Sequence, residues 1–150
     1  KTTEYLLRNC PSLTMIAVDR WAPPGDGSYY DDWAHDKYER DFLAKCAPYM
    51  DRLRIMKDWT VEAAKRVPDG SLDFVFVDAD HSEKGCRADI EAWMPKIKPD
   101  GWILGHDINW PGVRSAVDAL VPGYLIAPDV VWFRPVNPGP DWKRVWCDAD

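Results

Sequence analysis

The sequence predicts an α/β fold built on a mostly parallel sheet with helices on both faces, because short apolar runs alternate with helical stretches. The first observation is a series of short runs rich in apolar and β-branched residues, at 13–18, 53–56, 72–77 and 101–105. The second is an apolar stripe at helical spacing, formed by Cys86, Ile90, Trp93, Met94 and Ile97. Alternation of this kind is typical of strands joined by crossover helices.

The remaining elements follow from local signals. Helices are predicted at residues 2–8, 33–49 and 60–67, in a stretch after His81 that ends at a Lys98–Gly101 turn, and in a stretch from Val113 to Val121. Residues 123–127 and 130–136 predict a closing antiparallel hairpin around Pro128 and Asp129. A weaker pattern at 142–147 indicates a short edge strand. The aromatic, proline-containing loop at 21–32 is either a lid over a substrate or a surface excursion packed by its own side chains.

Composition limits the class of protein. With 150 residues, 46% hydrophobic, the chain has the size of one domain, predicted to span 1–150. A net charge of −6 argues against a nucleic-acid partner. No apolar stretch approaches the length of a membrane span or a signal peptide, so we expect a soluble, cytoplasmic protein. The four scattered cysteines (Cys10, Cys46, Cys86 and Cys147) are expected to be reduced thiols.

Polar residues follow two of the predicted strands at the point where each strand ends. Asp78-Ala79-Asp80-His81 comes after one apolar strand, and His106-Asp107 after the next. The carboxyl ends of parallel strands form the ligand crevice in open α/β sheets. Asp78, His106 and Asp107 therefore predict a divalent-metal site with mixed oxygen and nitrogen ligands, although the same residues also fit a site without metal.

Simpler roles remain open for these residues. Asp80 could cap the next helix, with Glu83 in its first turn, and His81 could satisfy backbone groups at the strand end. His35 lies in a charged helical segment and is expected to be a surface residue. Asp19, at the end of the first strand, can accept two hydrogen bonds from vicinal ribose hydroxyls, or else cap a turn.

Taken together, Phe74–His81, the Lys98–Gly101 turn, Gly105-His106-Asp107 and Asp19 resemble class I S-adenosylmethionine-dependent methyltransferases, nearest to small-molecule O-methyltransferases of the catechol and caffeoyl-CoA type. The resemblance implies a Rossmann-like fold and S-adenosylmethionine as cofactor. It further implies methyl transfer to an oxygen of a small-molecule acceptor, with or without a divalent metal ion.

The resemblance also implies roles for individual residues. Asp19 would bind the ribose of the cofactor, and its neighbour Arg20 would also bind the cofactor. Asp58 matches the position that takes the adenine amino group, and Trp59 could stack on the purine, although these two residues could also be a helix cap and a core residue. Asp78 would bind the cofactor, act as a catalytic residue and ligate the metal ion.

His81 stands where the resembling enzymes carry a lysine. The resemblance therefore implies a general base that takes the proton of the acceptor, and a histidine suits that task at neutral pH. The imidazole of His106 replaces an oxygen ligand of the family. This departure favours manganese, iron, nickel or zinc over magnesium, or else means that no metal is bound.

One departure is large. The family's first strand and glycine-rich loop have no counterpart before Lys1, so we expect the sequence to be incomplete and the missing strand to lie between the strands at 13–18 and 72–77. Two other functions remain open. Asp78-Ala79-Asp80 also fits a nucleotide-sugar glycosyltransferase, and a catalytically inactive binding module would need no glycine loop. A homo-oligomer is compatible with all three hypotheses about function.

Overall fold

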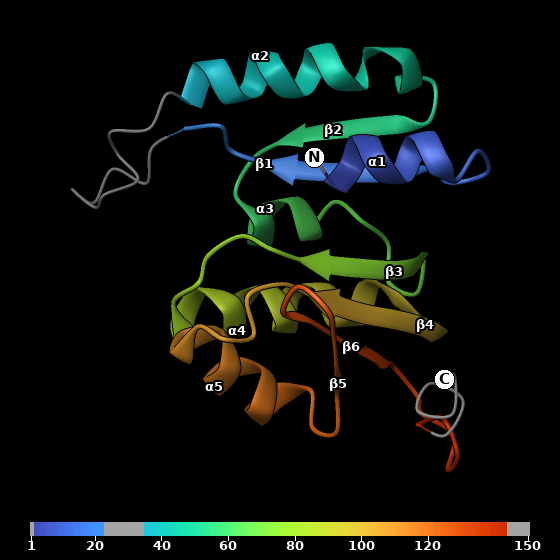
Figure 1. Cartoon of the computed structure of the whole chain (residues 1–150), viewed down its shortest axis with the longest axis vertical. Helices are drawn as coiled ribbons and strands as arrows, with labels where there is room; N and C mark the ends of the chain where they lie inside the picture. Colours follow the sequence, from blue (N-terminus) through green and yellow to red (C-terminus); the bar gives the residue numbers. More distant parts are fainter. Residues whose placement is uncertain (1, 23–34, 144–150) are drawn as a thin grey trace. The chain divides into compact units, whose positions relative to one another are not determined.

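The computed structural model describes residues 2–22 and 35–143, so most of the predicted lid and of the predicted strand at 142–147 lies outside the described residues (Figure 1). The chain divides into two compact parts, Lys1–Trp59 and Thr60–Asp150. No helix in either described stretch is both long and apolar enough to cross a lipid bilayer.

The first part pairs two parallel strands with two helices. Its elements are α1 (Thr2–Asn9), β1 (Met15–Asp19), α2 (His35–Cys46), the 3₁₀ helix η2 (Ala47–Tyr49) and β2 (Leu53–Lys57). The two strands run parallel, with Met15 opposite Leu53 and Asp19 opposite Lys57. Leu7 of α1 and Cys46 of α2 are buried together with Leu53 of β2, so both helices pack against this strand pair.

Arg52 fixes the end of α1 to the start of β2. Its guanidinium donates hydrogen bonds to the carbonyl oxygens of Leu7 at 2.7 Å, Cys10 at 3.1 Å and Leu13 at 2.8 Å. The last carbonyls of a helix have no partner within the helix, so a donor from elsewhere in the chain satisfies them. The planar fork of an arginine carries five N–H donors, so one guanidinium can serve three carbonyls.

We expect Arg52→Ala to lower the free energy of unfolding by about 2 kcal/mol, since it leaves three carbonyls without this charged donor. Urea denaturation would measure the change. Arg54→Ala is the matched control, because Arg54 is exposed on the same strand and its removal should alter stability by less than about 0.5 kcal/mol. Equal losses in the two variants would contradict the role assigned to Arg52.

The second part contains a mixed four-stranded sheet in the order β3-β4-β6-β5. Its elements are α3 (Thr60–Ala64), β3 (Leu72–Val77), α4 (Glu83–Trp93), η3 (Met94–Lys96), β4 (Ile97–Gly105), α5 (Pro111–Leu120), β5 (Leu125–Ala127) and β6 (Val131–Pro135). β3 and β4 are parallel, whereas β6 runs antiparallel to both β4 and β5. The predicted α/β class, the parallel pairing and the closing hairpin are confirmed.

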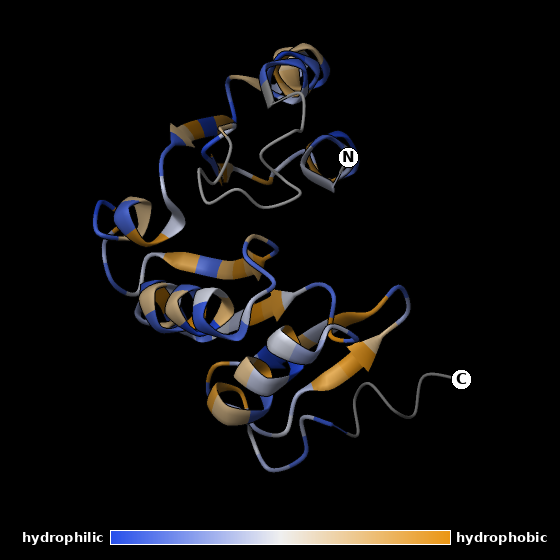
Figure 2. Cartoon of the chain, turned by 90° about the vertical axis from the view of Figure 1, so that its left-hand side faces the viewer, coloured by the Kyte–Doolittle hydropathy of each residue, from blue (hydrophilic) through white to orange (hydrophobic). Residues whose placement is uncertain are grey.

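The core of the second part lies between its sheet and its helices. Ile90 of α4, Val117 of α5, Ile103 of β4 and Trp132 of β6 are almost completely buried in one cluster. Figure 2 shows hydrophobic residues along the strands and mixed colouring on α4 and α5, as expected for helices that bury one face. Gly105 makes this packing possible, because any side chain there would collide with the ring of Trp132.

The structure corrects three details of the sequence-based assignment. The Lys98–Gly101 segment, predicted as a turn, belongs to β4, where the register with β3 shifts between Leu72 and Phe74. Gly101 permits this irregularity, because a Cβ there would lie 2.6 Å from the carbonyl oxygen of Asp73. The helix predicted over 60–67 ends at Ala64, and the residues before Pro68 form a turn instead.

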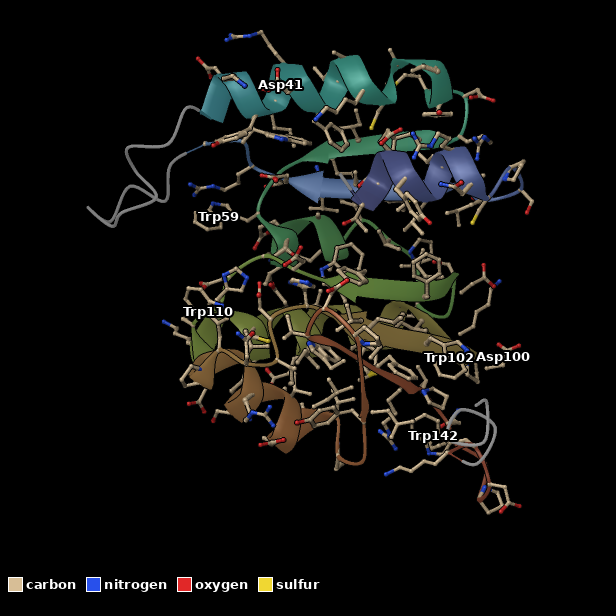
Figure 3. All side chains as sticks on the ribbon, viewed as in Figure 1. Asp41, Trp59, Asp100, Trp102, Trp110 and Trp142 are labelled. Carbon is tan, nitrogen blue, oxygen red and sulfur yellow. The ribbon has the colours of Figure 1, made fainter. Side chains whose placement is uncertain are left out.

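The third correction concerns Trp142, which begins the predicted edge strand but lies in a turn. Its ring contacts those of Trp102 and Phe133, with centroids 6.2 and 6.5 Å away (Figure 3). β1 and β3 each pair with one strand among the described residues. The expectation of a further strand between them stays a prediction.

Candidate functional site

The first group of predicted site residues lies at the carboxyl ends of β1 and β2. The main-chain amide of Asp58 donates to the carbonyl oxygen of Asp19 at 3.2 Å, which joins the two strand ends. The guanidinium of Arg20 lies 3.6 Å from the ring centroid of Trp59, and that indole is still 56% exposed. The structure therefore brings together Asp19, Arg20, Asp58 and Trp59, the four residues predicted to bind the nucleoside.

The carboxylates of Asp19 and Asp58 also make local hydrogen bonds. Asp19 Oδ1 accepts the amide of Trp21 at 2.8 Å, and Asp58 Oδ1 accepts the amide of Trp59 at 2.8 Å. The turn-capping role proposed for Asp19 as the simpler alternative is therefore present. Because a carboxylate has two oxygens and about four acceptor sites, this bond leaves capacity for a ligand.

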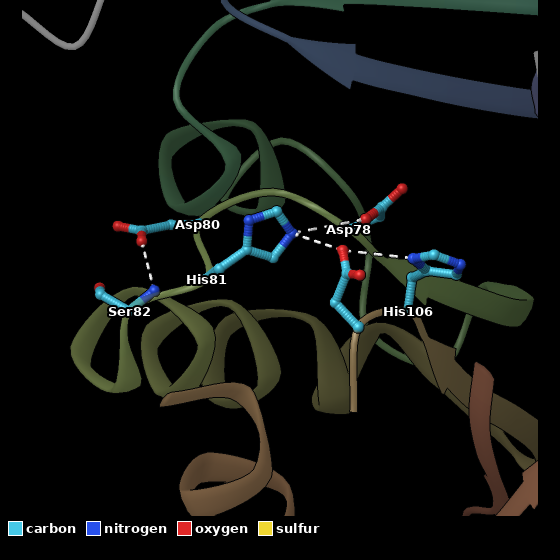
Figure 4. A network of polar contacts seen from close by, with 6 residues as sticks. Asp78, Asp80, His81, Ser82 and His106 are labelled. Carbon is cyan, nitrogen blue, oxygen red and sulfur yellow. Dashed lines mark hydrogen bonds and ion pairs between the residues drawn. The ribbon is translucent and has the colours of Figure 1, made fainter. Parts of the chain in front are cut away.

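The second group lies at the carboxyl ends of β3 and β4 (Figure 4). Nε2 of His81 is 2.9 Å from Oδ2 of Asp107 and 3.8 Å from Oδ1 of Asp78. Nδ1 of His106 is 3.2 Å from the same Oδ2 of Asp107. All four residues predicted for catalysis or metal binding thus share one cluster, in which Asp107 is the central member.

Asp107 reaches both histidines because of its backbone conformation. Its φ of 57° is in the left-handed region, which asparagine and aspartate tolerate better than other residues with a side chain. The amide of Trp110 donates to the carbonyl oxygen of Asp107 at 2.9 Å, and this turn leads into α5. Strained conformations of this kind are concentrated at functional sites.

Trp110 is a site residue that the sequence analysis did not identify. Its indole stacks on the imidazole of His81, with ring centroids 5.0 Å apart and planes 29° apart. Trp110 is still 45% exposed. The indole therefore fixes the orientation of the imidazole, while part of Trp110 remains accessible to a ligand.

Two glycines let the loop between β3 and α4 approach its neighbours. A Cβ at Gly112 of α5 would lie 2.5 Å from the carbonyl oxygen of His81 and 2.7 Å from the amide nitrogen of Glu83. A Cβ at Gly85 of α4 would collide with the carboxyl group of Asp80. The loop that carries Asp78 and His81 is thus held closely between two helices.

The residue that caps α4 is Ser82 and not Asp80, the alternative offered by the sequence, and Asp80 instead supports the cap residue. Ser82 is the N-cap of α4 and accepts the amide of Gly85 at 3.0 Å. Asp80 Oδ1 accepts the amide of Ser82 at 2.8 Å. Asp80 therefore has a structural task, whereas Asp78, two residues earlier, faces the cluster.

The cluster has the composition of a metal site. One ligand atom from each of Asp78, His81 and Asp107 can be chosen so that all three lie within 4.8 Å of one another. Nε2 of His81 is enclosed, and despite its short distance to Asp107 it has no hydrogen-bond partner of acceptable geometry. An enclosed nitrogen facing two carboxylates fits a cation between them. The three residues whose ligand atoms lie this close are Asp78, His81 and Asp107. His106, which was predicted as a ligand, is not among them and contacts Asp107.

The comparisons with known proteins agree with this architecture. The sequence profile of a family described as a methyltransferase domain matches residues 3–108. An uncharacterised protein y4gI of Sinorhizobium fredii is 31% identical over 92 residues, which are 61% of this chain but 10% of that protein. The chain therefore corresponds to a small portion of this relative.

Several solved structures share the fold, and two of the three described here are O-methyltransferases. CalS11, a TDP-rhamnose 3′-O-methyltransferase of calicheamicin biosynthesis, superposes with a TM-score of 0.58 at 14% identity, over 89% of this chain and 65% of that one. The O-methyltransferase NovP superposes with a TM-score of 0.59 at 14% identity, over 91% of this chain and 66% of that one. Cofactor-bound Rv0187 from MTB superposes with a TM-score of 0.62 at 16% identity, over 92% of this chain and 68% of that one.

The fold is therefore the Rossmann-like α/β fold of S-adenosylmethionine-dependent O-methyltransferases. The chain belongs to the methyltransferase domain family whose profile it matches over residues 3–108. The chain spans about two thirds of each of these solved structures.

Proposed function

We propose that this protein transfers the methyl group of S-adenosylmethionine to a hydroxyl oxygen of a small-molecule acceptor. The observation that carries the proposal is the cluster of Asp78, His81, His106 and Asp107 at the carboxyl ends of β3 and β4, in a chain of this family. In the reaction, the acceptor oxygen forms a bond to the methyl carbon while the carbon–sulfur bond breaks. The products are the methyl ether, S-adenosylhomocysteine and a proton.

The residues at the ends of β1 and β2 suit the nucleoside of the donor. Asp19 is the last residue of the parallel strand β1, and an acidic residue at a strand end binds ribose hydroxyls in nucleotide-binding sheets. Trp59 presents a half-exposed indole, backed by Arg20, on which a purine could stack. Asp58, with one oxygen engaged by the Trp59 amide, can accept from the adenine amino group.

The residues at the ends of β3 and β4 suit the acceptor. His81 is oriented by Asp107 on one side and by the indole of Trp110 on another, so it can accept the hydroxyl proton in a fixed geometry. The exposed part of Trp110 offers a surface for an apolar or ring-containing acceptor. CalS11, whose fold this chain shares, acts on a TDP-sugar, and this supports a small molecule with several hydroxyls as the acceptor class.

As the alternative to proton transfer to His81, the residues Asp78, His81 and Asp107 would hold a divalent ion, and a bound ion would lower the pKa of the acceptor hydroxyl. The mixed nitrogen and oxygen donors favour manganese, iron, nickel or zinc over magnesium. The protein's own contribution is to hold two carboxylates and one imidazole facing one another.

We expect Asp19→Ala to weaken the binding of S-adenosylhomocysteine by about 10- to 100-fold, since a charge-assisted hydrogen bond to ligand contributes about 1.5–3 kcal/mol. Isothermal titration calorimetry would measure the dissociation constant. Asp51→Ala is the control, because Asp51 is exposed in a turn before β2. Unchanged affinity in Asp19→Ala would remove the ribose role from Asp19.

For the metal, we expect Mn²⁺ or Ni²⁺ to bind the parent protein and to bind Asp107→Asn at least about tenfold more weakly, as ionised ligands dominate the affinity. Asparagine tolerates the left-handed backbone of Asp107, so this variant isolates the charge. Titration calorimetry with each ion, without cofactor or acceptor, provides the readout. Equal affinities would show that the ion does not bind through Asp107, and absence of binding in the parent would leave His81 as a general base acting without metal.

The same titrations separate the other functions. Binding of UDP-sugar with no binding of S-adenosylhomocysteine would favour a glycosyltransferase, which the family match does not support. Absence of both would favour an inactive binding module. A homo-oligomer remains a separate prediction, to be measured by sedimentation.

A further inference from the structure

One buried carboxylate lies outside the site described above. Asp89 of α4 is 2% exposed and is the one charged side chain that is buried among the described residues. It lies beside Cys86, Ile90 and Trp93 on the buried face of the helix. Its Oδ2 atom has no hydrogen-bond partner. Burying a carboxylate is costly, so a side chain held in this way calls for a reason beyond packing.

The contacts of Asp89 join three separate segments of the second part. The hydroxyl of Thr60, the first residue of α3, and the main-chain amide of Asp80 both donate hydrogen bonds to the Asp89 carboxyl group. Burial raises the pKa of this carboxyl group, and the two hydrogen bonds lower it. The same Thr60 hydroxyl accepts a hydrogen bond from the indole of Trp93 at 2.7 Å. Asp89 therefore connects α4 to the start of α3 and to the loop that follows β3.

Asp80 is placed between Asp78 and His81, and it is attached to α4 through both its backbone and its side chain. Its amide is held by Asp89, its carboxyl group lies against the Cα of Gly85, and its Oδ1 accepts the amide of Ser82. Asp89 and Gly85 are one helical turn apart, so they present a single docking surface on α4. The loop is closed from the other side by Gly112 of α5.

We propose that Asp89 is a positioning residue of the site: by accepting the main-chain amide of Asp80, it holds the loop carrying Asp78 and His81 in the conformation in which both face Asp107. This inference rests on the function proposed for that loop. Asp89 has no contact with the Asp78, His81 and Asp107 ligand atoms in the described structure, so its effect on them passes through the backbone. What it supplies is an acceptor oxygen at a fixed place, which an asparagine would supply as well.

Amide exchange and histidine NMR test this without cofactor or acceptor. In the parent we expect the Asp80 amide to be protected, and in Asp89→Ala to exchange at least about tenfold faster, the equivalent of one lost hydrogen bond. The ring-proton signals of His81, shifted by the stacked indole of Trp110, should move toward the positions of an unstructured peptide. Three histidines make assignment by substitution simple.

Two variants complete the design. Asp89→Asn should keep the Asp80 protection and the His81 signals near the parent, and Glu91→Gln, exposed on the same helix, should leave both unchanged. If Asp89→Ala does not fold, the exchange rate of the Asp80 amide in the parent protein still tests the proposal, because exchange at the free-peptide rate would overturn it. Equal protection of the Asp80 amide in the parent and in a folded Asp89→Ala would also overturn it. Failure of S-adenosylhomocysteine to bind would instead count against the proposed function and leave these measurements standing.

Discussion

Gly112→Ala is expected to lower the free energy of unfolding by about 1–3 kcal/mol, although alanine is the better helix former. Gly112 is in the first turn of α5, where helix propensity alone would make alanine more stable by up to about 1 kcal/mol. The added Cβ would meet main-chain atoms of His81 and Glu83 at 2.5 and 2.7 Å, and these cannot rotate away. Overpacking at such a contact costs about 1–3 kcal/mol, so the contact should decide the sign.

The measurement is urea denaturation combined with the binding of Mn²⁺. The loop from Asp78 to Glu83 must move to admit the methyl group, so we expect metal binding to weaken together with stability. Gly139→Ala is the matched control, since a Cβ there meets nothing within 4 Å. A Gly112→Ala protein at least as stable as the parent would show that the loop is not tightly packed against α5.

The fold class could be predicted from the sequence because its signals are local. Each buried strand is a short apolar run, and α4 shows its buried face directly in the spacing of Cys86, Ile90 and Trp93. The Lys98–Gly101 segment was misassigned because its Pro-Asp-Gly composition is typical of a turn. The structure instead accommodates it as an irregularity within β4, where the approach of the Asp73 carbonyl requires glycine.

The sequence could predict which residues gather in the candidate site, because the ends of neighbouring parallel strands lie together. Asp78, His81, His106 and Asp107 were placed together because they follow neighbouring parallel strands. Which of them contact one another could not be predicted, since this depends on the left-handed backbone of Asp107. The stacking of Trp110 on His81 depends in turn on how the chain enters α5.

Asp89 shows a signal that the sequence does carry. It is three residues after Cys86 and four before Trp93, which places a carboxylate inside the apolar stripe of a predicted helix. A charged residue on a buried face normally has polar partners in the fold. The partners themselves, Thr60 and the amide of Asp80, come from segments 29 and 9 residues away in the chain, and only the folded structure identifies them.

The burial of Asp89 predicts an unusual dependence of stability on pH. Burial raises the pKa of its carboxyl group to about 7, against the lowering effect of the Thr60 and Asp80 hydrogen bonds, whereas the unfolded chain has a pKa of about 3.9. Between these values the folded protein binds more protons than the unfolded chain. The contribution of Asp89 to stability is therefore fully present below about pH 4 and is lost as the pH rises through about 7.

We expect this loss to amount to about 2–4 kcal/mol, since each unit of pKa difference corresponds to about 1.4 kcal/mol. Urea denaturation of the parent and of Asp89→Asn at pH 5, 6, 7 and 8 would measure it. The parent should lose stability relative to the variant at each step, and the difference isolates Asp89 from the other carboxylates. Parallel pH profiles would contradict the burial-induced shift, and Glu91→Gln should run parallel to the parent.

The same three variants at Asp89 and Glu91 separate charge from position. An asparagine keeps an oxygen that can accept the Asp80 amide but has no proton to titrate, so Asp89→Asn should abolish the pH dependence and still protect that amide. An alanine lacks the oxygen as well, so Asp89→Ala should lose both properties. If the loop with Asp78 and His81 depended on the negative charge of Asp89 instead, Asp80 protection in the parent would rise as the pH passes 7, and Asp89→Asn would resemble Asp89→Ala.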